Sequence, residues 1–417
     1  MLARTDGRSR RRGIILLWGV WAVTRGLYAA ALLKLVSFQL LKPAAGDVRL
    51  YRHWARVLAA GSFPADDPRW QYPPLAGAVM LLPRLSGRDY LATFVFLMVL
   101  VDALVLVLLL RAGGSPAGAW TWVAGMFLLG PFCYARYDLV VVLAAVAALL
   151  ALPRMGTFGT LTGVGAMLKV WPVFLLLGLP RGRGGVRALT AFAAAAGAGL
   201  AAAAALGGGG WGFLAGQQGR GLQMESVAAT PFHVARVLGW MGVTTRPRYG
   251  SRELVGTGVP AAATVCLTLT VVALAVIAVI ARRRPAADWD PVFACDVALA
   301  VTLAAVVTSR VLSPQYLSWL LGVGAVCLTR VSTRQRAAVA LILAAALLSH
   351  VEFPLLWKSI AKGYPAGVGV LAARNLLLVA ATVLAILRLR GGPCPRPAGT
   401  PGPRFRPDGK IATFPER

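Results

Sequence analysis

Apolar runs alternate with short polar segments along most of the chain. Many of these runs approach the roughly 20 residues that an α-helix needs to cross a bilayer. The pattern predicts an all-α polytopic membrane protein: a bundle of about 10–12 transmembrane helices with amphipathic or re-entrant helices on its outer face. The expected spans lie at 13–36, 90–110, 118–131, 138–152, 188–206, 259–280, 291–308, 317–328, 337–349 and 368–386.

Arginine clusters set the expected orientation of these spans. Arg10–Arg12 precede the first run and Arg282–Arg284 follow the run at 259–280, and such clusters favour the cytoplasmic side. No clean small-residue cleavage site follows the first run, so we expect a retained helix rather than a signal peptide. The expected divisions are a basic cytoplasmic N-terminus at 1–12, a transmembrane domain at 13–390 with extracytoplasmic loops at about 37–89 and 207–257, and a disordered, proline- and arginine-rich cytoplasmic tail at 391–417.

Composition supports the membrane assignment. The 417 residues are 58% hydrophobic and only 14% charged, whereas a soluble domain is about 25% charged. The net charge of +28 could indicate nucleic-acid binding, but the arginines lie between apolar runs. Membrane topology and lipid contact explain them better, so we expect membrane lipids and no nucleic acid as partners. The five cysteines and three histidines are scattered and predict neither a disulfide framework nor a metal site.

Two apolar segments are too irregular for simple spans. Residues 74–85 form an apolar stretch that is too short to cross the membrane, which suggests an interfacial or re-entrant helix. Residues 156–179 lie between arginine-bearing ends that both favour the cytoplasm. We expect a broken hairpin there, with Lys169 at its outer tip and Pro172 supplying the break.

The polar stretch at 46–74 is the feature around which a site can be expected. Val48, Tyr51, Trp54 and Leu58 recur at helical spacing, which predicts a short amphipathic helix at 47–60. Asp47 then stands at its N-terminus, either as a capping carboxylate or as a carboxylate directed into a site at the membrane surface. The sequence leaves both possibilities open.

Other charged residues fall on the same expected outer side, and each has an ordinary alternative. Lys169 could be a snorkelling lysine or a phosphate ligand, and Arg310 an interface anchor or a ligand for a donor. Arg220 and Glu225 could simply pair with each other. Two further expectations concern structure: an ion pair at the turn Arg136–Tyr137–Asp138, and buried partners for Asp102 and Asp296 within their spans.

Several motifs in this order resemble the GT-C membrane glycosyltransferases, and glycosyltransferase family 87 in particular. They are a first-loop Asp47 followed by Tyr51, the sequence Tyr72-Pro73-Pro74-Leu75, and a Lys-x-x-Pro break at Lys169. The segments at 220–226 and 313–316 are also similar to this family. The resemblance covers most of residues 13–390, although each motif alone is short.

The resemblance implies an inverting transfer of a hexose, mannose being the expected sugar, from a polyprenyl-phosphate donor to a glycolipid or glycan hydroxyl. It implies the extracytoplasmic face of the plasma membrane, with the polyprenyl-phosphate sugar as donor substrate, no cofactor and no metal. Asp47 is carried over as the general base, and Asp66 and Asp67 are not excluded from that role. The residues expected to bind substrate are Tyr51, Asp66, Asp67, Tyr72, Lys169, Arg220, Glu225, Arg310, Gln315 and Tyr316.

Two other classes of protein fit part of the pattern. A flippase or transporter of lipid-linked sugars is also polytopic with charges inside the membrane. It would be expected to show broken helices at mid-membrane and repeated halves. A membrane scaffold without catalytic activity would not require polar residues to converge on one side.

Overall fold

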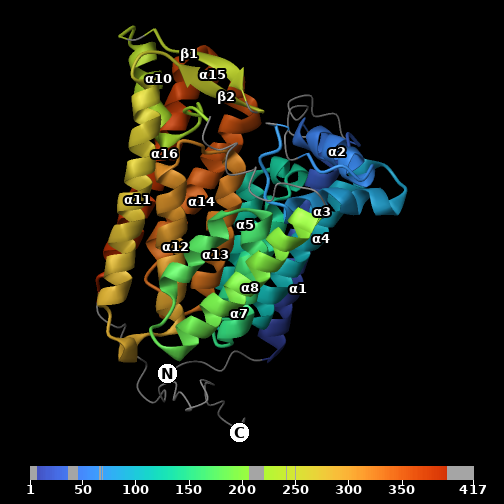
Figure 1. Cartoon of the computed structure of the whole chain (residues 1–417), viewed down its shortest axis with the longest axis vertical. Helices are drawn as coiled ribbons and strands as arrows, with labels where there is room; N and C mark the ends of the chain where they lie inside the picture. Colours follow the sequence, from blue (N-terminus) through green and yellow to red (C-terminus); the bar gives the residue numbers. More distant parts are fainter. Residues whose placement is uncertain are drawn as a thin grey trace.

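The computed structural model shows a tall bundle of helices (Figure 1). It describes residues 7–35, 46–64, 67, 69–205, 220–240, 242–248 and 250–391. Several sequence expectations lie outside these residues: the first part of the basic N-terminus, Asp66, the glycine run at 207–210, and nearly all of the C-terminal tail.

Seven helical stretches in the described part are long and apolar enough to cross a membrane. Together with the shorter apolar helices they form the all-α polytopic bundle that the sequence predicts. The long stretches comprise α1 (Gly7–Leu32), α4 (Tyr90–Arg111), α8 (Arg183–Ala205), α11 (Val259–Arg283), α12 (Pro291–Thr308), α14 (Arg336–His350) continued through Val351–Leu356 to α15 (Trp357–Lys362), and α16 (Pro365–Leu389).

Shorter helices fill the interior of the bundle, and α13 is buried along its whole length. Three of them adjoin 3₁₀ turns at the upper end of the bundle, and each turn has a proline in its first two positions. Proline lacks an N–H and interrupts regular helix, so the backbone changes course at these turns. The helices are α5 (Ala117–Leu129), α6 (Asp138–Leu150), α7 (Met155–Leu168) and α13 (Leu317–Thr329), and the turns are η3 (Pro131–Ala135), η4 (Trp171–Gly178) and η7 (Pro314–Tyr316).

The break expected in the segment 156–179 is confirmed. α7 ends at Leu168, Lys169 has extended backbone, and η4 then begins at Trp171. The change of direction therefore occurs at Lys169, while Pro172 lies in the first turn of the returning 3₁₀ helix.

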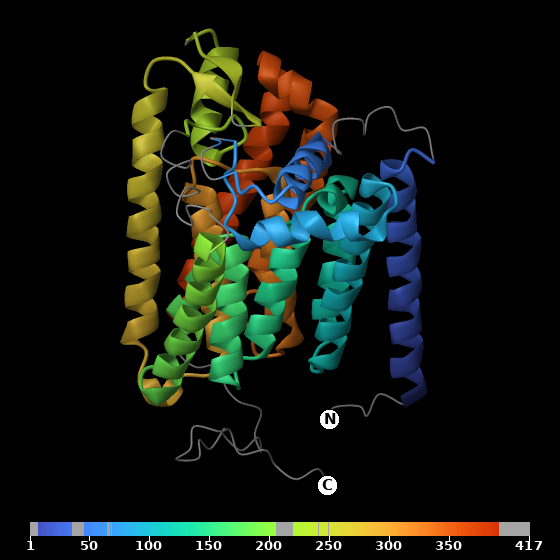
Figure 2. The same ribbon diagram turned by 45° about the vertical axis from the view of Figure 1, so that its right-hand side comes forward.

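The upper end of the bundle, as drawn in Figure 1, carries the remaining elements, and α1 begins at the opposite end. Figure 2 shows α3 lying across the bundle, with α2 above it. The segment expected to be a long loop at 211–256 contains a helix and a hairpin in its described part, so that expectation was incomplete. The elements are α2 (Gly46–Ala59), α3 (Leu75–Leu81), η2 (Leu82–Ser86), η5 (Val227–Ala229), α10 (Thr230–Val237), and strands β1 (Thr244–Arg248) and β2 (Ser251–Val255), which are antiparallel.

Glycines allow α7 and α8 to pack closely. A Cβ atom added to Gly159 would lie 2.0 Å from the carbonyl oxygen of Ala188, and one added to Gly163 would lie 2.8 Å from that of Phe192. Glycines four residues apart on one helix face permit such backbone contact between membrane helices. The close packing holds α8 against α7, the helix that ends directly before Lys169.

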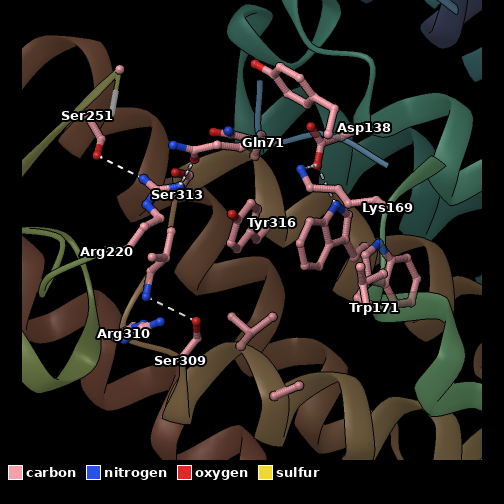
Figure 3. Close-up of a pocket in the computed structure, with 18 of the residues that line it drawn as sticks. Gln71, Asp138, Lys169, Trp171, Arg220, Ser251, Ser309, Arg310, Ser313 and Tyr316 are labelled. Atoms are coloured by element: carbon pink, nitrogen blue, oxygen red, sulfur yellow. Dashed lines mark hydrogen bonds and ion pairs between the residues drawn. The ribbon is translucent and has the colours of Figure 1, made fainter. Parts of the chain in front are cut away.

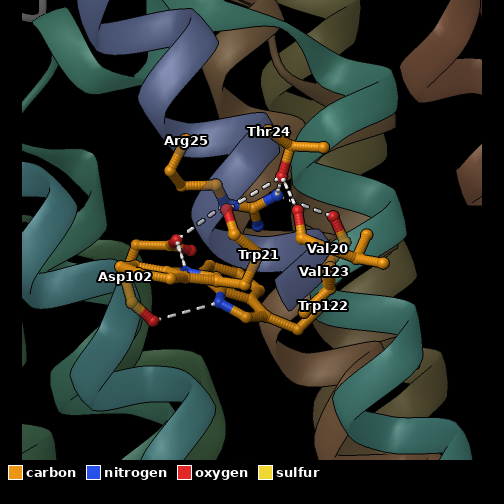
Figure 4. A network of polar contacts seen from close by, with 7 residues as sticks. All are labelled: Val20, Trp21, Thr24, Arg25, Asp102, Trp122 and Val123. Atoms are coloured by element: carbon orange, nitrogen blue, oxygen red, sulfur yellow. Dashed lines mark hydrogen bonds and ion pairs between the residues drawn. The ribbon is translucent and has the colours of Figure 1, made fainter. Parts of the chain in front are cut away.

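A buried ion pair joins α1 to α4, as expected for Asp102 (Figure 4). Arg25 Nε lies 2.9 Å from Asp102 Oδ2, and Trp21 Nε1 donates to the same oxygen at 2.5 Å. Arg25 also donates to the Val123 carbonyl of α5 at 2.9 Å. Asp296 is likewise partnered, since Thr333 Oγ1 donates to it at 2.6 Å. These charges are tolerated in an apolar bundle because protein groups replace water around them.

Removing one member of the Arg25–Asp102 pair should destabilise the bundle strongly. Asp102→Asn leaves a guanidinium with 1% exposure without its counter-charge, a change that costs about 3–5 kcal/mol in comparable buried pairs. The double variant Arg25→Met/Asp102→Leu should melt at a higher temperature in detergent than Asp102→Asn alone, because it buries no charge. Arg284→Gln, which removes a more exposed pair with Asp290, is the control and should change little. Equal melting temperatures for Asp102→Asn and the wild type would contradict this account.

Candidate active site

A cavity of about 610 Å³ opens at the upper end of the bundle. Residues from widely separated parts of the sequence line it. In Figure 3, Arg220 and Arg310 lie on one side, Lys169 and Asp138 on the other, and Tyr316 between them. The lining includes Asp47, Tyr51, Arg69, Gln71, Tyr72, Tyr137, Asp138, Lys169, Trp171, Arg220, Ser251, Ser309, Arg310, Ser313, Gln315, Tyr316 and Trp319.

Helix α2 places Asp47 at the cavity. Its apolar residues Val48, Tyr51 and Trp54 are buried, as their helical spacing predicts. Asp47 is the second residue of the helix, and its carboxylate lies 2.8 Å from Arg136 Nε, with 37% of the side chain exposed. The carboxylate is thus both fixed by an ion pair and accessible to a ligand.

Arg136, Tyr137 and Asp138 connect the two sides of the site. They lie between η3 and the start of α6, where the chain turns into the bundle. Arg136 pairs with Asp47, and Tyr137 packs against Tyr51 and Tyr72 with ring centroids 5.6 Å and 5.8 Å away. The three consecutive residues therefore tie α2 and the segment after it to the core of the bundle.

Asp138 holds Lys169 in the cavity wall. Lys169 Nζ lies 2.6 Å from Asp138 Oδ1, and Trp319 Nε1 donates to the same oxygen at 2.8 Å. The ammonium also lies 4.9 Å from the ring centroids of both Tyr316 and Trp319. A carboxylate and aromatic faces together stabilise a cation in a partly desolvated place.

Arg220 lies on the opposite side of the cavity. Its guanidinium donates to Gln71 Oε1 at 3.0 Å and to Ser251 Oγ at 3.2 Å, and its Nε lies 4.0 Å from Glu253 Oε1. The contacts come from the segment before α3 and from strand β2. They fix the planar guanidinium at the cavity wall, a geometry suited to an anionic oxygen.

Arg310 follows α12 and is held through its backbone. Gln223 N donates to the Arg310 carbonyl oxygen at 2.9 Å, and Gln223 Nε2 donates to Ser313 Oγ at 3.1 Å. The segment at 220–226 therefore supports the cavity wall in two ways. Arg220 is itself part of the wall, and Gln223 holds the backbone of Arg310.

Glu225 lies behind this wall in a buried polar cluster. Gln223 Nε2 donates to its carboxylate at 2.6 Å, and Arg374 Nη2 donates to its carbonyl oxygen at 3.0 Å. Arg374 also pairs with Glu352, at 2.7 Å, and both side chains have 0% exposure. Burial and the neighbouring Glu352 raise the pKa of Glu225 to about 8, so Glu225 carries a proton at neutral pH.

Most residues expected to bind substrate line this one cavity, together with Asp47. Asp67 does not: it lies outside the lining and pairs with Arg69, whose hydrogen bond lowers the pKa of Asp67. Glu225 is buried behind the wall, and Asp66 is outside the described residues. Those in the lining are Tyr51, Tyr72, Lys169, Arg220, Arg310, Gln315 and Tyr316.

Two expected pairings are wrong. Arg220 does not pair with Glu225, because its guanidinium points to Gln71, Ser251 and Glu253 while Glu225 points into the bundle. Arg136 and Asp138 likewise have different partners from those expected. The turn between them directs Arg136 toward Asp47 and Asp138 toward Lys169, so both ion pairs belong to the cavity.

Sequence reasoning missed the aromatic wall. Trp319 stacks between Trp171 and Tyr316, with centroid distances of 5.2 Å and 4.0 Å. Trp319 lies in a mainly apolar helix, where the sequence pattern does not distinguish a tryptophan of a site from one of the core. Its position only three residues after Tyr316, on the same helical side, is the clue that was available.

The described residues contain no group of three or more His, Cys, Asp or Glu side chains that could hold a metal ion. The charged groups of the cavity are instead arranged as carboxylate–cation pairs. The arrangement can hold an anionic ligand beside an ionised carboxylate.

The fold and the cavity define a multi-span membrane protein with a charged site at one end of its bundle. A family model for glycosyltransferase family 87 matches residues 70–314, more than half of the chain, and the chain therefore belongs to that family. The family assignment makes it a membrane glycosyltransferase, and the helical bundle is consistent with the GT-C fold. The matched range contains Lys169, Arg220 and Arg310 but begins after Asp47. Comparisons with curated proteins and with solved structures give no match.

The buried proton of Glu225 should make stability depend on pH. The folded protein holds this proton up to about pH 8, whereas the unfolded chain releases it near the ordinary glutamate pKa of 4.5. Between these two pH values the unfolded state therefore binds fewer protons than the folded state. The stability that protonated Glu225 contributes to the fold is lost as the pH rises from about 5 to 8. Glu225→Gln should flatten that fall in melting temperature relative to wild type. An identical pH dependence for the two proteins would show that Glu225 is ionised in the fold.

Proposed function

We propose that this glycosyltransferase moves a hexose, namely mannose, from a polyprenyl-phosphate donor to a hydroxyl of a glycolipid or glycan, with inversion, at the extracytoplasmic face of the plasma membrane. One observation carries the proposal: a single cavity brings an accessible carboxylate, Asp47, together with the cations Lys169, Arg220 and Arg310. Donor sugar, acceptor, membrane and face come from the family resemblance and the charge pattern of the chain.

Asp47 is the base in the proposed reaction. The acceptor oxygen attacks the anomeric carbon, the bond from that carbon to the phosphate oxygen breaks, and the acceptor proton passes to Asp47. Attack on the side opposite the leaving phosphate gives inversion. Arg136 holds one carboxylate oxygen at 2.8 Å, which fixes the orientation of the group.

The cavity cations would hold the phosphate. Charge accumulates on the phosphate oxygens as the glycosidic bond breaks, and fixed positive groups stabilise it. Arg220 and Lys169 are already oriented by protein contacts and so need little reorganisation. Because a lipid phosphate leaves as an anion, the reaction requires neither a cofactor nor a general acid, and the donor itself is a substrate.

One side of the cavity suits a prenyl chain. Its lining there comes from α11, α12 and η4, and is mainly apolar. A lipid donor could place its phosphate among the cations and its chain along this side, where apolar surface leaves water. The residues are Phe174, Cys266, Leu267, Thr270, Ala305 and Val306.

Asp47→Asn tests the base directly. An amide cannot accept the acceptor proton, so turnover with radiolabelled polyprenyl-phosphate mannose should fall by about 10²-fold or more. Donor binding should persist, because other residues hold the phosphate. Asp89→Asn is the matched control: it makes the same change at the N-cap of α4, outside the cavity lining, where Asn caps about as well as Asp, and turnover should stay close to wild type. An Asp47→Asn protein that binds donor and transfers sugar at the wild-type rate would exclude Asp47 as the base.

Thiol labelling tests the proposed face. Ser62 follows α2 at the same end of the bundle as the cavity, whereas Ala286 follows α11 at the opposite end. In intact cells, an impermeant thiol reagent should label Ser62→Cys and leave Ala286→Cys unlabelled until the membrane is opened. The reverse pattern would place the cavity on the cytoplasmic side and overturn the proposed donor arrangement.

A further inference from the structure

Helix α2 has a second side that the cavity does not use. Arg49, Arg52 and Arg56 are exposed there, together with His53, while the apolar side of the helix is buried. Residues three and four apart lie on one helix face, so the guanidinium groups form a single stripe. The helix that places Asp47 thus presents a row of cations on its opposite side.

The turn η2 follows α3, which packs against α2, and it exposes apolar side chains. Leu85 is 81% exposed and Leu82 is 49% exposed, and Arg84 and Arg88 next to them are exposed as well. The apolar helix α4 begins at Tyr90, so these residues stand at the edge of the apolar part of the bundle. Exposed leucines alternating with arginines at such an edge are typical of a segment that lies in the membrane interface.

α2 and η2 belong to one continuous surface. Leu58 of α2 packs against Gly77 of α3, directly before η2 in the chain. Arg52 and Arg84 both lie within electrostatic range of the Tyr90 hydroxyl. Figure 2 shows α2 and α3 adjacent at the upper end of the bundle.

This surface carries an excess of positive charge. The nearby described carboxylates are engaged elsewhere: Asp47 with Arg136, Asp67 with Arg69, and Asp89 with the first turn of α4, where it accepts from Ala92 N. Clustered guanidinium groups repel one another, and phosphate oxygens relieve that repulsion through charge-assisted hydrogen bonds. Among the described residues the five arginines of this surface therefore outnumber the carboxylate that stands on it, Asp89.

We infer that this surface, made of Arg49, Arg52, Arg56, Arg84 and Arg88 with Leu82 and Leu85, binds the headgroups of anionic phospholipids. The phosphate oxygens contact the arginines, and the two leucines enter the acyl region at the edge of the bundle. The proposal does not depend on the reaction at the cavity.

Native mass spectrometry of the full chain in mild detergent tests it. The protein is mixed with equal amounts of dioleoylphosphatidylglycerol and dioleoylphosphatidylcholine, and retained lipids are counted. Wild type should retain the anionic lipid preferentially, and Arg52→Gln/Arg84→Gln should lower that preference about threefold or more, since it removes one arginine from each element of the surface. Leu85→Gln should lower retention of both lipids.

A matched control distinguishes the loss of this binding surface from a change in the net charge of the protein. Arg246→Gln/Lys362→Gln removes the same charge from exposed positions on β1 and α15, at the same end of the bundle, and should keep the wild-type preference. All four positions are exposed, so the variants should fold, and melting temperatures check this. An unchanged preference in Arg52→Gln/Arg84→Gln, or an equal loss in the control, would overturn the inference.

Discussion

Two ion pairs hold the upper end of the bundle together, and each contains one residue of the same short turn. Arg136 reaches back to Asp47 of α2, and Asp138 reaches forward to Lys169 after α7. Arg136 and Asp138 are themselves almost fully buried, and a buried charge without its counter-charge is costly. The fold can therefore bury this turn only if α2 and the α7–η4 break are in place. The same requirement brings a carboxylate and an ammonium to one cavity.

A second buried set of charges supports the cavity from behind. The carbonyl of Glu225 and the carboxylate of Glu352 share the Arg374 guanidinium, which joins α16, the segment after α14 and the segment at 220–226. That last segment also carries Arg220 and holds the Arg310 carbonyl. The position of the two cavity arginines thus depends on a polar cluster that lies outside the cavity lining.

Sequence could predict the membrane helices well. The bounds of α12 agree with the apolar run at 291–308, because Pro291 opens it and a polar serine–arginine pair closes it. The helix α10 and the β1–β2 hairpin were missed because they are short: α10 has eight residues and each strand has five, too few to show a clear apolar period. Such elements form through tertiary contacts such as the bridge from Gln223 to Glu253.

The residues of the candidate site could be predicted in part, whereas their pairings could not. Unusual charges between apolar runs identified Asp47, Lys169, Arg220 and Arg310, which line one cavity. Their partners could not be derived, because a carboxylate near several arginines in sequence gives no indication of which one the fold brings close. Asp138 shows the difficulty: its neighbour Arg136 is two residues away, yet its partner Lys169 comes from another helix end.

The paired charges of the cavity also set its total charge. The described charged groups that line it or pair with its lining have one more positive charge than negative charges: Arg69, Arg136, Lys169, Arg220 and Arg310 against Asp47, Asp67, Asp138 and Glu253. The donor proposed above, a sugar–phosphate–lipid diester, carries a single negative charge, which equals the excess among these described groups. In the proposed reaction the phosphate gains a second negative charge as Asp47 becomes protonated, so this balance is preserved through transfer. Loss of that proton to water then leaves one negative charge in excess, which favours release of the lipid phosphate and couples product departure to resetting of the base.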